Sequence, residues 1–299
     1  MMLSRTMSPI LAAFVSILLT AGCRHQNLIS HRPTLPVQEH VERMKREVAG
    51  HQLAYLHHSP TGQRPEMGWP LLLFLHGYGE CGNDLQKVKK HGPPKLIQQI
   101  PPLQGCVVIS PQCPSDSWWR VEALHALVEE VISGRGDIDR NRLYVTGLSM
   151  GGYGIWSFLS HHPDYFAAAI PICGGGDPFR LPANRPPEKT GITNEFLPEG
   201  LRQAAEVAIW TFHGSKDASV PPLESERMIQ LLREAGNPQT RLTVYPGLGH
   251  VGAWERAYLD PMVWEWLFRQ SKQTGDDADG VSSSLPDRPA TSIPLHRGP

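Results

Sequence analysis

Short apolar runs alternate with amphipathic stretches along the middle of the chain. Several runs contain almost no polar residue, which is typical of strands buried on both faces of a sheet. The runs that we expect to be strands are Leu53–His58, Pro70–Gly77, Gly105–Pro111, Arg142–Gly147, Ala167–Cys173, Val207–Gly214 and Arg241–Gly247. The first of these is expected at an edge of the sheet.

Stretches with apolar residues at helical spacing separate these runs. The expected helices are Val121–Ser133, Gly152–Leu159, Leu223–Ala235 and Trp254–Gln270, and the stretch Asp84–Ile100 is expected to be partly helical with a break at Gly92-Pro93-Pro94. Strands that alternate with helices predict an α/β fold with a mostly parallel central sheet and helices on both faces. Functional groups of such sheets gather at the carboxyl ends of the strands.

The first residues have the pattern of an export signal. Arg5 is followed by an apolar run, Ile10–Leu19, and then by small residues. This run is about half as long as the ~20 residues that span a bilayer. The end of the segment, LLTAGC, resembles a bacterial lipobox with Cys23 as the lipidated residue. The alternative is an ordinary signal peptide in which Cys23 is incidental.

These observations divide the chain into four parts. Residues 1–22 are expected to be a lipoprotein signal peptide, and residues 23–47 a polar tether that ends in a short helical piece. Residues 48–272 form the folded domain. Residues 273–299 are rich in Asp, Ser, Pro and Gly and are expected to be a disordered tail. The protein is then exported and anchored in a membrane, on its periplasmic or cell-surface side, through several acyl chains on Cys23.

Composition narrows the function classes. The chain has 299 residues, of which 40% are hydrophobic, enough for a sizeable core. Its formal net charge of −1 gives no basic surface for nucleic acid. The cysteines after Cys23 form no C-x-x-C pair, which argues against a zinc site. Cys106 and Cys173 lie in apolar runs, whereas Cys81 and Cys113 lie in loops and are candidates for a disulfide.

The motif Gly147-Leu148-Ser149-Met150-Gly151 lies between an expected strand and an expected helix. In that context G-x-S-x-G is typical of a nucleophile elbow, a sharp turn that holds the serine hydroxyl clear of the sheet. Glycines flank the serine because side chains at their positions would collide across the turn. The alternative is a glycine-rich turn with a solvent-facing serine.

Two partners for Ser149 follow at later strand ends. Asp217 comes after the strand that ends near Phe212, and His250 comes after the last strand. The chain order Ser, Asp, His is that of the α/β-hydrolases. We expect His250 to take the proton of Ser149 and Asp217 to orient the imidazole. Asp177, one strand earlier, is the competitor for the role of Asp217.

Two backbone amides are needed to stabilise an oxyanion next to Ser149. One is expected from Met150, directly after the serine. The other is expected from the glycine-rich loop after Leu75, at Tyr78 or Gly79. His76 is expected to hold this loop by hydrogen bonds. The scheme needs no metal and no cofactor.

Six blocks of the sequence, in order, resemble the dienelactone-hydrolase-like, phospholipase/carboxylesterase-type serine esterases, a group also described as predicted peptidases related to prolyl oligopeptidase. They are LLLFLHGYGECGND, VVISPQCP, RLYVTGLSMGGYGIW, AAAIPICGGGDP, IWTFHGSKDASVP and LTVYPGLGHVGAW. The resemblance covers about residues 68–268. It implies an α/β-hydrolase fold with Ser149, Asp217 and His250 as the catalytic triad.

The chain departs from this group in two places. Cys81 stands where the first glycine-rich loop usually has an arginine. The connection 174–206 is longer and richer in proline than usual, and is expected to be a lid, a wall of the substrate site, or a solvated insertion.

Three tryptophans near the expected strand ends are candidates for substrate binding. Trp118, Trp119 and Trp254 would suit a sugar-linked or an aromatic acyl ester, and core packing is the alternative for each. The sequence thus predicts an exported, lipid-anchored, cofactor-free serine hydrolase that acts on small carboxylic esters. A peptidase acting on short peptides, or a catalytically silent lipoprotein that binds polysaccharide, are the alternatives.

Overall fold

The computed structural model describes residues 38–176 and 197–272. Residues 1–37, which include the expected signal peptide and Cys23, residues 273–299, Asp177 and most of the connection 174–206 lie outside the described residues. Across the described ranges, no helix is both long enough and apolar enough to cross a membrane.

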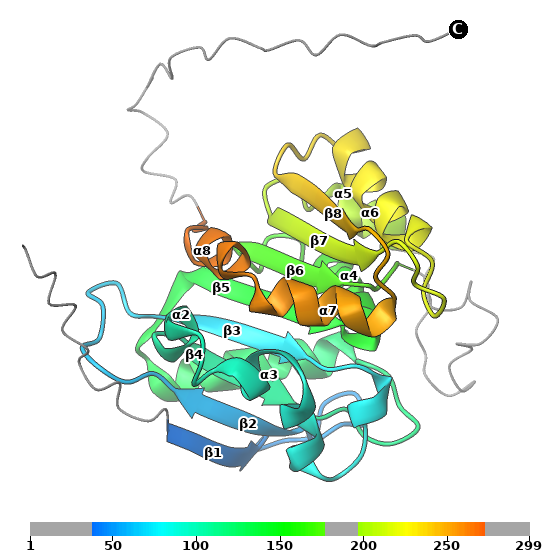
Figure 1. Ribbon diagram of the computed structural model, residues 1–299. Coiled ribbons are helices and arrows are strands. Elements are labelled where there is room, and N and C mark those ends of the chain that lie inside the picture. Colours follow the sequence, from blue (N-terminus) through cyan, green and yellow to red (C-terminus); the bar gives the residue numbers. More distant parts are fainter. Residues whose placement is uncertain (1–37, 177–196, 273–299) are drawn as a thin grey trace, which may run out of the picture. The chain divides into compact units, whose positions relative to one another are not determined.

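Eight strands of the described residues form one sheet in the order β1-β2-β4-β3-β5-β6-β7-β8 (Figure 1). The strands are β1 Gln38–Arg43, β2 Ala54–Ser59, β3 Trp69–Leu75, β4 Val107–Pro111, β5 Ile138–Leu148, β6 Ala168–Ile172, β7 Ala208–Gly214 and β8 Thr240–Tyr245. Neighbours from β4 to β8 are parallel, and only β2 runs against the strands beside it. The sheet is therefore mostly parallel.

Helices cover both faces of this sheet. They are α1 Gly92–Leu96, α2 Pro101–Gln104, α3 Val121–Arg135, α4 Met150–His161, α5 Leu197–Arg202, α6 Leu223–Glu234, α7 His250–Leu259 and α8 Pro261–Phe268, with two 3-10 turns, η1 Tyr78–Glu80 and η2 Leu85–Lys90. Residues of α3, α4, α5 and α6 share one core cluster, and residues of α1, α2, α7 and α8 share the other. The predicted fold class is confirmed.

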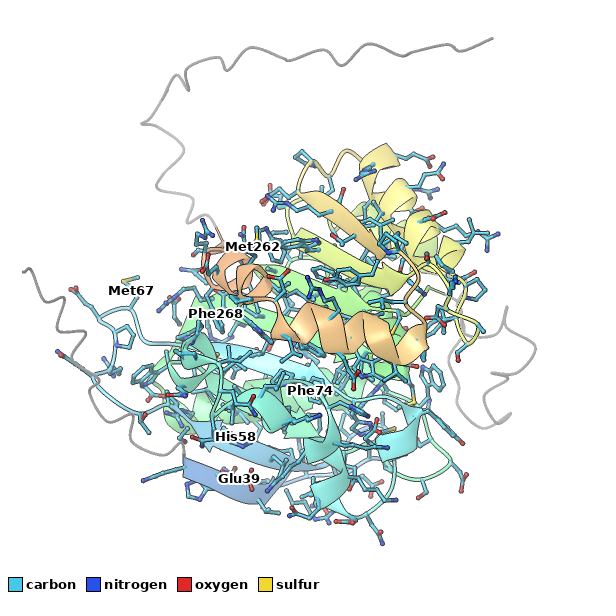
Figure 2. The ribbon with its side chains drawn as sticks, in the orientation of Figure 1. Glu39, His58, Met67, Phe74, Met262 and Phe268 are labelled. Atoms are coloured by element: carbon cyan, nitrogen blue, oxygen red, sulfur yellow. The ribbon has the colours of Figure 1, made fainter. Side chains whose placement is uncertain are left out.

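Successive side chains of β3 divide between these two clusters. Leu71 and Leu73 join the α3–α6 side, whereas Leu72 and Phe74 join the other side, in accord with the two-residue period of a strand. Figure 2 labels Phe74 at β3 beneath α7, and its ring meets Tyr258 of α7 edge-on at 6.3 Å between centroids. Burial on both faces explains why the run contains no polar residue.

The edge of the sheet differs from expectation. β2 is not the edge strand, because β1 pairs along its outer side, within the stretch expected to be a tether with a helical piece. Glu39 contacts His58 at 2.9 Å, and Glu42 contacts His57 at 2.7 Å, so carboxylates of β1 pair with imidazoles of β2. Figure 2 shows Glu39 and His58 on these neighbouring strands. The polar outer face of β1 hid it from a search for apolar runs.

Proline placement corrects two helix predictions. The helix expected over Trp254–Gln270 is two helices, α7 and α8, because Pro261 begins a new helix and Asp260 caps it through the amide of Met262. The Gly92-Pro93-Pro94 sequence begins α1 rather than breaking a helix.

The turn between β5 and α4 is tightly packed. Ser149 has φ +52° and ψ −116°, a conformation that costs a non-glycine residue on the order of 1–3 kcal/mol. A Cβ at Gly147 would lie 2.8 Å from the carbonyl oxygen of Leu75, and a Cβ at Gly151 only 2.0 Å from the same atom. The glycines therefore allow α4 to begin directly against the end of β3, and this contact supports the strained serine.

We predict that Gly151→Ala destabilises the fold by about 3 kcal/mol or more, because its methyl group would overlap backbone that cannot move aside. Gly134→Ala in α3 is the matched control. No atom lies within 4 Å of its added Cβ, so the change should stabilise the helix by roughly 0.5–1 kcal/mol. Urea denaturation of both variants gives the comparison. Equal stability of Gly151→Ala and the unchanged protein would refute the close packing.

Candidate active site

The structure brings Ser149, His250 and Asp217 into one hydrogen-bonded chain. Ser149 Oγ lies 2.9 Å from His250 Nε2, and His250 Nδ1 lies 2.6 Å from Asp217 Oδ2. Ser149 follows β5, Asp217 follows β7 and His250 is the first residue of α7, after β8. Parallel strands bring their carboxyl ends to the same edge of the sheet, so residues 101 positions apart in sequence meet there.

The carboxylate of Asp217 accepts hydrogen bonds at both oxygens. Oδ1 receives the amides of Ser219 and Val220, each at 2.9 Å. Oδ2 faces His250 and, at 3.2 Å, Nε2 of His213. Burial by itself raises the pKa of Asp217, but the hydrogen bonds from His213, His250 and the Val220 amide outweigh it and hold that pKa well below its usual value. The group therefore remains ionised near neutral pH.

His213 is a site residue that our reading of the sequence missed. It lies on β7, four residues before Asp217, and is fully buried. The signal was a histidine in the last positions of an otherwise apolar strand, just ahead of the expected acid. A buried histidine needs partners for both ring nitrogens, and Asp217 is within reach of one of them.

His250 is only partly covered. Its side chain is 17% exposed, and the ring of Trp254, one helical turn later, meets it edge-on at 5.1 Å between centroids. Trp254 also contacts the ring of His91 at 5.4 Å. The imidazole is thus fixed from one side by Asp217 and from another by Trp254, while solvent still reaches it.

The glycine-rich loop approaches Ser149 from the end of β3. A Cβ added at Gly77 would lie 3.7 Å from the Cβ of Ser149. Met150 begins α4, and Tyr78 and Gly79 begin η1. The first amides of a helix have no partner within it, so these N–H groups are available to a ligand near Ser149. The side chain of Tyr78 is 59% exposed.

His76 holds this loop, as we expected. Its Nδ1 lies 2.6 Å from the carbonyl oxygen of Gly77, and its Nε2 accepts the amide of Cys113 at 3.0 Å. The carbonyl oxygen of His76 accepts Nε1 of Trp119 at 3.3 Å. Gln112 adds hydrogen bonds from its Nε2 to the carbonyl oxygens of Glu80 and Asp84, both at 2.8 Å. The segment after β4 therefore fixes the loop after β3.

Cys81 and Cys113 meet at this junction without forming a disulfide. The four cysteines of the described residues are free thiols, and the neighbouring thiol of Cys113 lowers the pKa of Cys81. Cys173 is fully buried and lies close to Asp217 and His250. Among the described residues, the one set with metal-ligand spacing is Cys173, Asp217 and His250, whose ligand atoms lie within 4.8 Å of one another. The last two already share a hydrogen bond, so a metal ion would compete with it.

The tryptophans predicted to line a substrate site are all buried. Trp118 is 6% exposed and Trp119 is 2% exposed, and both belong to the core cluster with α3 and α4. Trp119 packs on His76 at 4.8 Å between ring centroids and lies against Gly154 of α4. These two side chains therefore pack beneath the site, as the core-packing alternative proposed, and do not line it. Trp254 is 6% exposed and is the one that contacts a triad candidate.

Comparison with protein families gives one matching model, the prolyl oligopeptidase family, over residues 119–181 and 196–274. Among curated proteins, a poly(3-hydroxyoctanoate) depolymerase of Pseudomonas fluorescens is 26% identical over 166 residues. This match covers 46% of the chain and 59% of the depolymerase. A putative carboxymethylenebutenolidase of Escherichia coli is 30% identical over 118 residues, 40% of the chain and 39% of that enzyme. The chain therefore spans less than two thirds of the curated relatives that it matches.

Solved structures give wider coverage. A thermostable esterase is 30% identical with a TM-score of 0.60, covering 78% of this chain and 63% of the esterase. S-formylglutathione hydrolase from Staphylococcus aureus has a TM-score of 0.62 at 15% identity, covering 79% of this chain and all of that enzyme. An acylaminoacyl peptidase of Pyrococcus horikoshii has a TM-score of 0.58 at 16% identity, covering 80% of this chain and 42% of the peptidase. At identities of 15% and 16%, the S-formylglutathione hydrolase and the acylaminoacyl peptidase show that the fold is shared and no more.

We predict that His76 makes the fold less stable as the pH falls from about 6.5 to 4. Its Nδ1–H donates to Gly77 and its Nε2 accepts from Cys113, so a second proton would have no acceptor. Burial lowers the pKa of His76 to about 4 against a slight opposing effect of the Gly77 hydrogen bond, whereas an unfolded histidine titrates near 6.5. The unfolded chain therefore binds the extra proton between these values, which costs up to ~3 kcal/mol of stability.

Urea denaturation at several pH values tests this prediction. The stability advantage of the unchanged protein over His76→Gln should shrink by up to ~3 kcal/mol between pH 7 and pH 4. His40→Gln, at an exposed position of β1, should follow the unchanged protein at every pH. A constant difference between His76→Gln and the unchanged protein would show that His76 is not kept neutral by its surroundings.

Proposed function

Because the chain belongs to the serine hydrolases of the α/β-hydrolase superfamily, we propose that it cleaves carboxylic esters through an acyl-enzyme formed on Ser149. The membership agrees with the resemblance in the six sequence blocks. The proposal about the reaction rests on one observation, the chain of hydrogen bonds from Ser149 through His250 to Asp217. A hydroxyl is a weak nucleophile at neutral pH unless such a base takes its proton.

In the first half-reaction, Ser149 Oγ attacks the carbonyl carbon of the ester. His250 Nε2, at 2.9 Å, accepts the hydroxyl proton as the new C–O bond forms. The imidazolium is stabilised by the ionised carboxylate of Asp217 at 2.6 Å. His250 then gives the proton to the departing alcohol oxygen, which leaves the acyl group on Ser149.

The negative charge that develops on the carbonyl oxygen needs donors fixed in advance. The amide of Met150 and an amide of Tyr78 or Gly79 supply them, because all three begin helical segments beside Ser149. His76 and Gln112 hold the glycine-rich loop in place, so little reorganisation accompanies the reaction. Loss of one such donor typically costs about 10²–10³-fold in kcat.

In the second half-reaction, water replaces the alcohol. His250 is partly exposed, so a water molecule can reach Nε2 and lose its proton there as it attacks the acyl carbon. The proton then returns to Ser149 Oγ, and the acid is released. Nothing in this cycle consumes a cofactor.

An ester is a better-supported substrate than a peptide. The relative with 30% identity over 78% of the chain is an esterase, and the depolymerase and carboxymethylenebutenolidase also bear the names of ester- or lactone-cleaving enzymes. The solved peptidase is 16% identical, which carries only the fold. The match to the prolyl oligopeptidase family keeps a peptidase acting on short peptides as the second candidate.

The protein acts, in this proposal, outside the cytoplasm while attached to a membrane. The charged start, short apolar run and LLTAGC sequence support cleavage before Cys23 and its acylation. Several acyl chains give firm anchoring, whereas one chain binds only marginally. The ester substrate would then be met at the periplasmic or cell-surface side, where a carbohydrate-linked ester is one candidate.

We expect Ser149→Ala and His250→Ala each to lower kcat for 4-nitrophenyl acetate by about 10⁴-fold or more, and Asp217→Asn by about 10⁴-fold. Ser149→Ala should also abolish labelling by a fluorophosphonate probe, which reacts with activated serines. Ser160→Ala, near the end of α4 and away from the site, should keep full turnover and labelling. Full turnover by Ser149→Ala would refute the assignment of the nucleophile.

A substrate panel separates the two enzymatic candidates. We expect kcat/KM for acetyl, feruloyl or longer-chain 4-nitrophenyl esters to exceed that for short peptide anilides by at least about 100-fold, since the alcohol of an ester leaves more easily than an amide nitrogen and the chain is 30% identical to a thermostable esterase but 16% identical to the peptidase. Anilide hydrolysis at a comparable rate would favour the peptidase. Ser149→Ala serves as the blank for each substrate.

For the anchor, we predict that the mature protein begins at Cys23 and carries acyl chains. Mass spectrometry of the purified membrane form should show the added mass on the first residue. Cys23→Ser should leave the membrane fraction, whereas Cys81→Ser should stay in it. A Cys23→Ser variant that remains with the membrane would contradict lipid anchoring at this residue.

A further inference from the structure

We infer that His213 is a positioning residue for the proposed reaction: its Nε2–H holds the carboxylate of Asp217 in line with His250, and the hydroxyl of Ser225 holds the imidazole ring at its other nitrogen. The inference rests on the proposed function of Ser149, Asp217 and His250. It adds a second layer to the site, extending it from β7 to α6.

The surroundings of Nε2 determine that it carries a hydrogen. It lies 2.9 Å from the carbonyl oxygen of Val220 and 3.2 Å from Oδ2 of Asp217. Both neighbours are acceptors, so Nε2 must donate, and the hydrogen is shared between them. One donor thus ties the carboxylate to the far end of the turn that contains it, residues 217–220.

The other ring nitrogen has a partner of matching chemistry. Nδ1 lies 2.7 Å from Ser225 Oγ, which belongs to α6 and is fully buried. A neutral imidazole with a hydrogen on Nε2 accepts at Nδ1, so the Ser225 hydroxyl donates there. The same hydroxyl also donates to the carbonyl oxygen of Gly174 at 3.2 Å, so its one hydrogen is shared between that oxygen and Nδ1. The two acceptors at Nε2 therefore select the tautomer with its hydrogen toward Asp217, and Ser225 holds the ring at its other nitrogen.

Removal of His213 leaves Asp217 with three of its four donors. The two amides on Oδ1 still anchor one oxygen, but the orientation of Oδ2 toward His250 is less constrained. A misplacement of about 1 Å at a catalytic group can cost on the order of 10²-fold in rate. The carboxylate would also present more negative charge to His250, which favours the imidazolium.

Paired amide substitutions distinguish the positioning role from mere packing. The amide nitrogen of His213→Gln can reach the position of Nε2 and donate to Asp217, whereas the shorter His213→Asn can replace only Nδ1. We expect His213→Asn and His213→Ala to lower kcat for 4-nitrophenyl acetate by about 30–100-fold with little change in KM. His213→Gln should restore kcat to within about 5-fold of the unchanged protein. Rates are normalised to the sites labelled by the fluorophosphonate probe.

The pH profile of kcat/KM supplies a second readout. In His213→Asn the acid limb should move to higher pH, because the imidazolium of His250 is favoured. Cys173, the other titratable group beside Asp217 and His250, is held neutral by burial that raises its pKa well above the usual value, so it does not contribute to this limb. In His213→Gln the limb should lie close to that of the unchanged protein.

Equal kcat and superimposable pH profiles for His213→Asn and His213→Gln would overturn the inference while the proposed function stands. An unchanged protein that neither labels nor hydrolyses esters would overturn the proposed function itself. If the His213 variants do not fold, Ser225→Ala decides the matter. It keeps the imidazole but removes its partner at Nδ1, so the ring is less firmly held; we expect a fall in kcat of about 3–10-fold, and an unaltered kcat would refute the role of the pair.

Discussion

The contact between the end of β3 and the start of α4 is the constraint on which the site depends. The carbonyl oxygen of Leu75 lies where a side chain on Gly151 would have to be, and α4 can begin there only because that side chain is absent. The amide of Ser149 donates to the carbonyl oxygen of Ile172 at 2.9 Å, which fixes the turn from the β6 side. A serine with positive φ is held between two strands by packing that its own backbone preference opposes.

The site also requires a buried carboxylate with enough hydrogen-bond donors, and the turn around Asp217 supplies two of them. Asp217 sits at a tight turn whose own amides serve one oxygen, so only the other oxygen needs partners from elsewhere. Those partners are imidazoles of β7 and α7. An unpaired buried carboxylate would be costly, and the same hydrogen bonds that remove this cost also define the direction in which His250 points.

The sequence was most informative where both faces of an element are buried. β3, β4 and β6 are fully buried and were found from apolar runs, and the strict G-x-S-x-G spacing located the elbow because few other residues fit it. β1 was missed because its residues are largely exposed. His213 and Gln112 were missed because their roles come from contacts across 28 or more positions, or from a turn geometry that spacing does not reveal. For Trp118 and Trp119 the sequence left substrate binding and core packing open, since a strand end can direct a side chain either to the mouth of the site or beneath it; the structure packs both in the core.

Three histidines, His76, His213 and His250, lie near the end of the sheet that carries Ser149, and their hydrogen-bond partners differ. His76 has a backbone acceptor on one nitrogen and a backbone donor on the other, so its one ring proton cannot leave, and a second cannot bind, without breaking a buried hydrogen bond. His213 shares its Nε2 hydrogen between two acceptors and faces Ser225, away from solvent. Nε2 of His250 faces the hydroxyl of Ser149 on a side chain that is partly exposed, whereas the hydroxyl that His213 faces is fully buried. The local partners, rather than the residue type, therefore distinguish the histidine that we propose as the base from the two that we propose as supports.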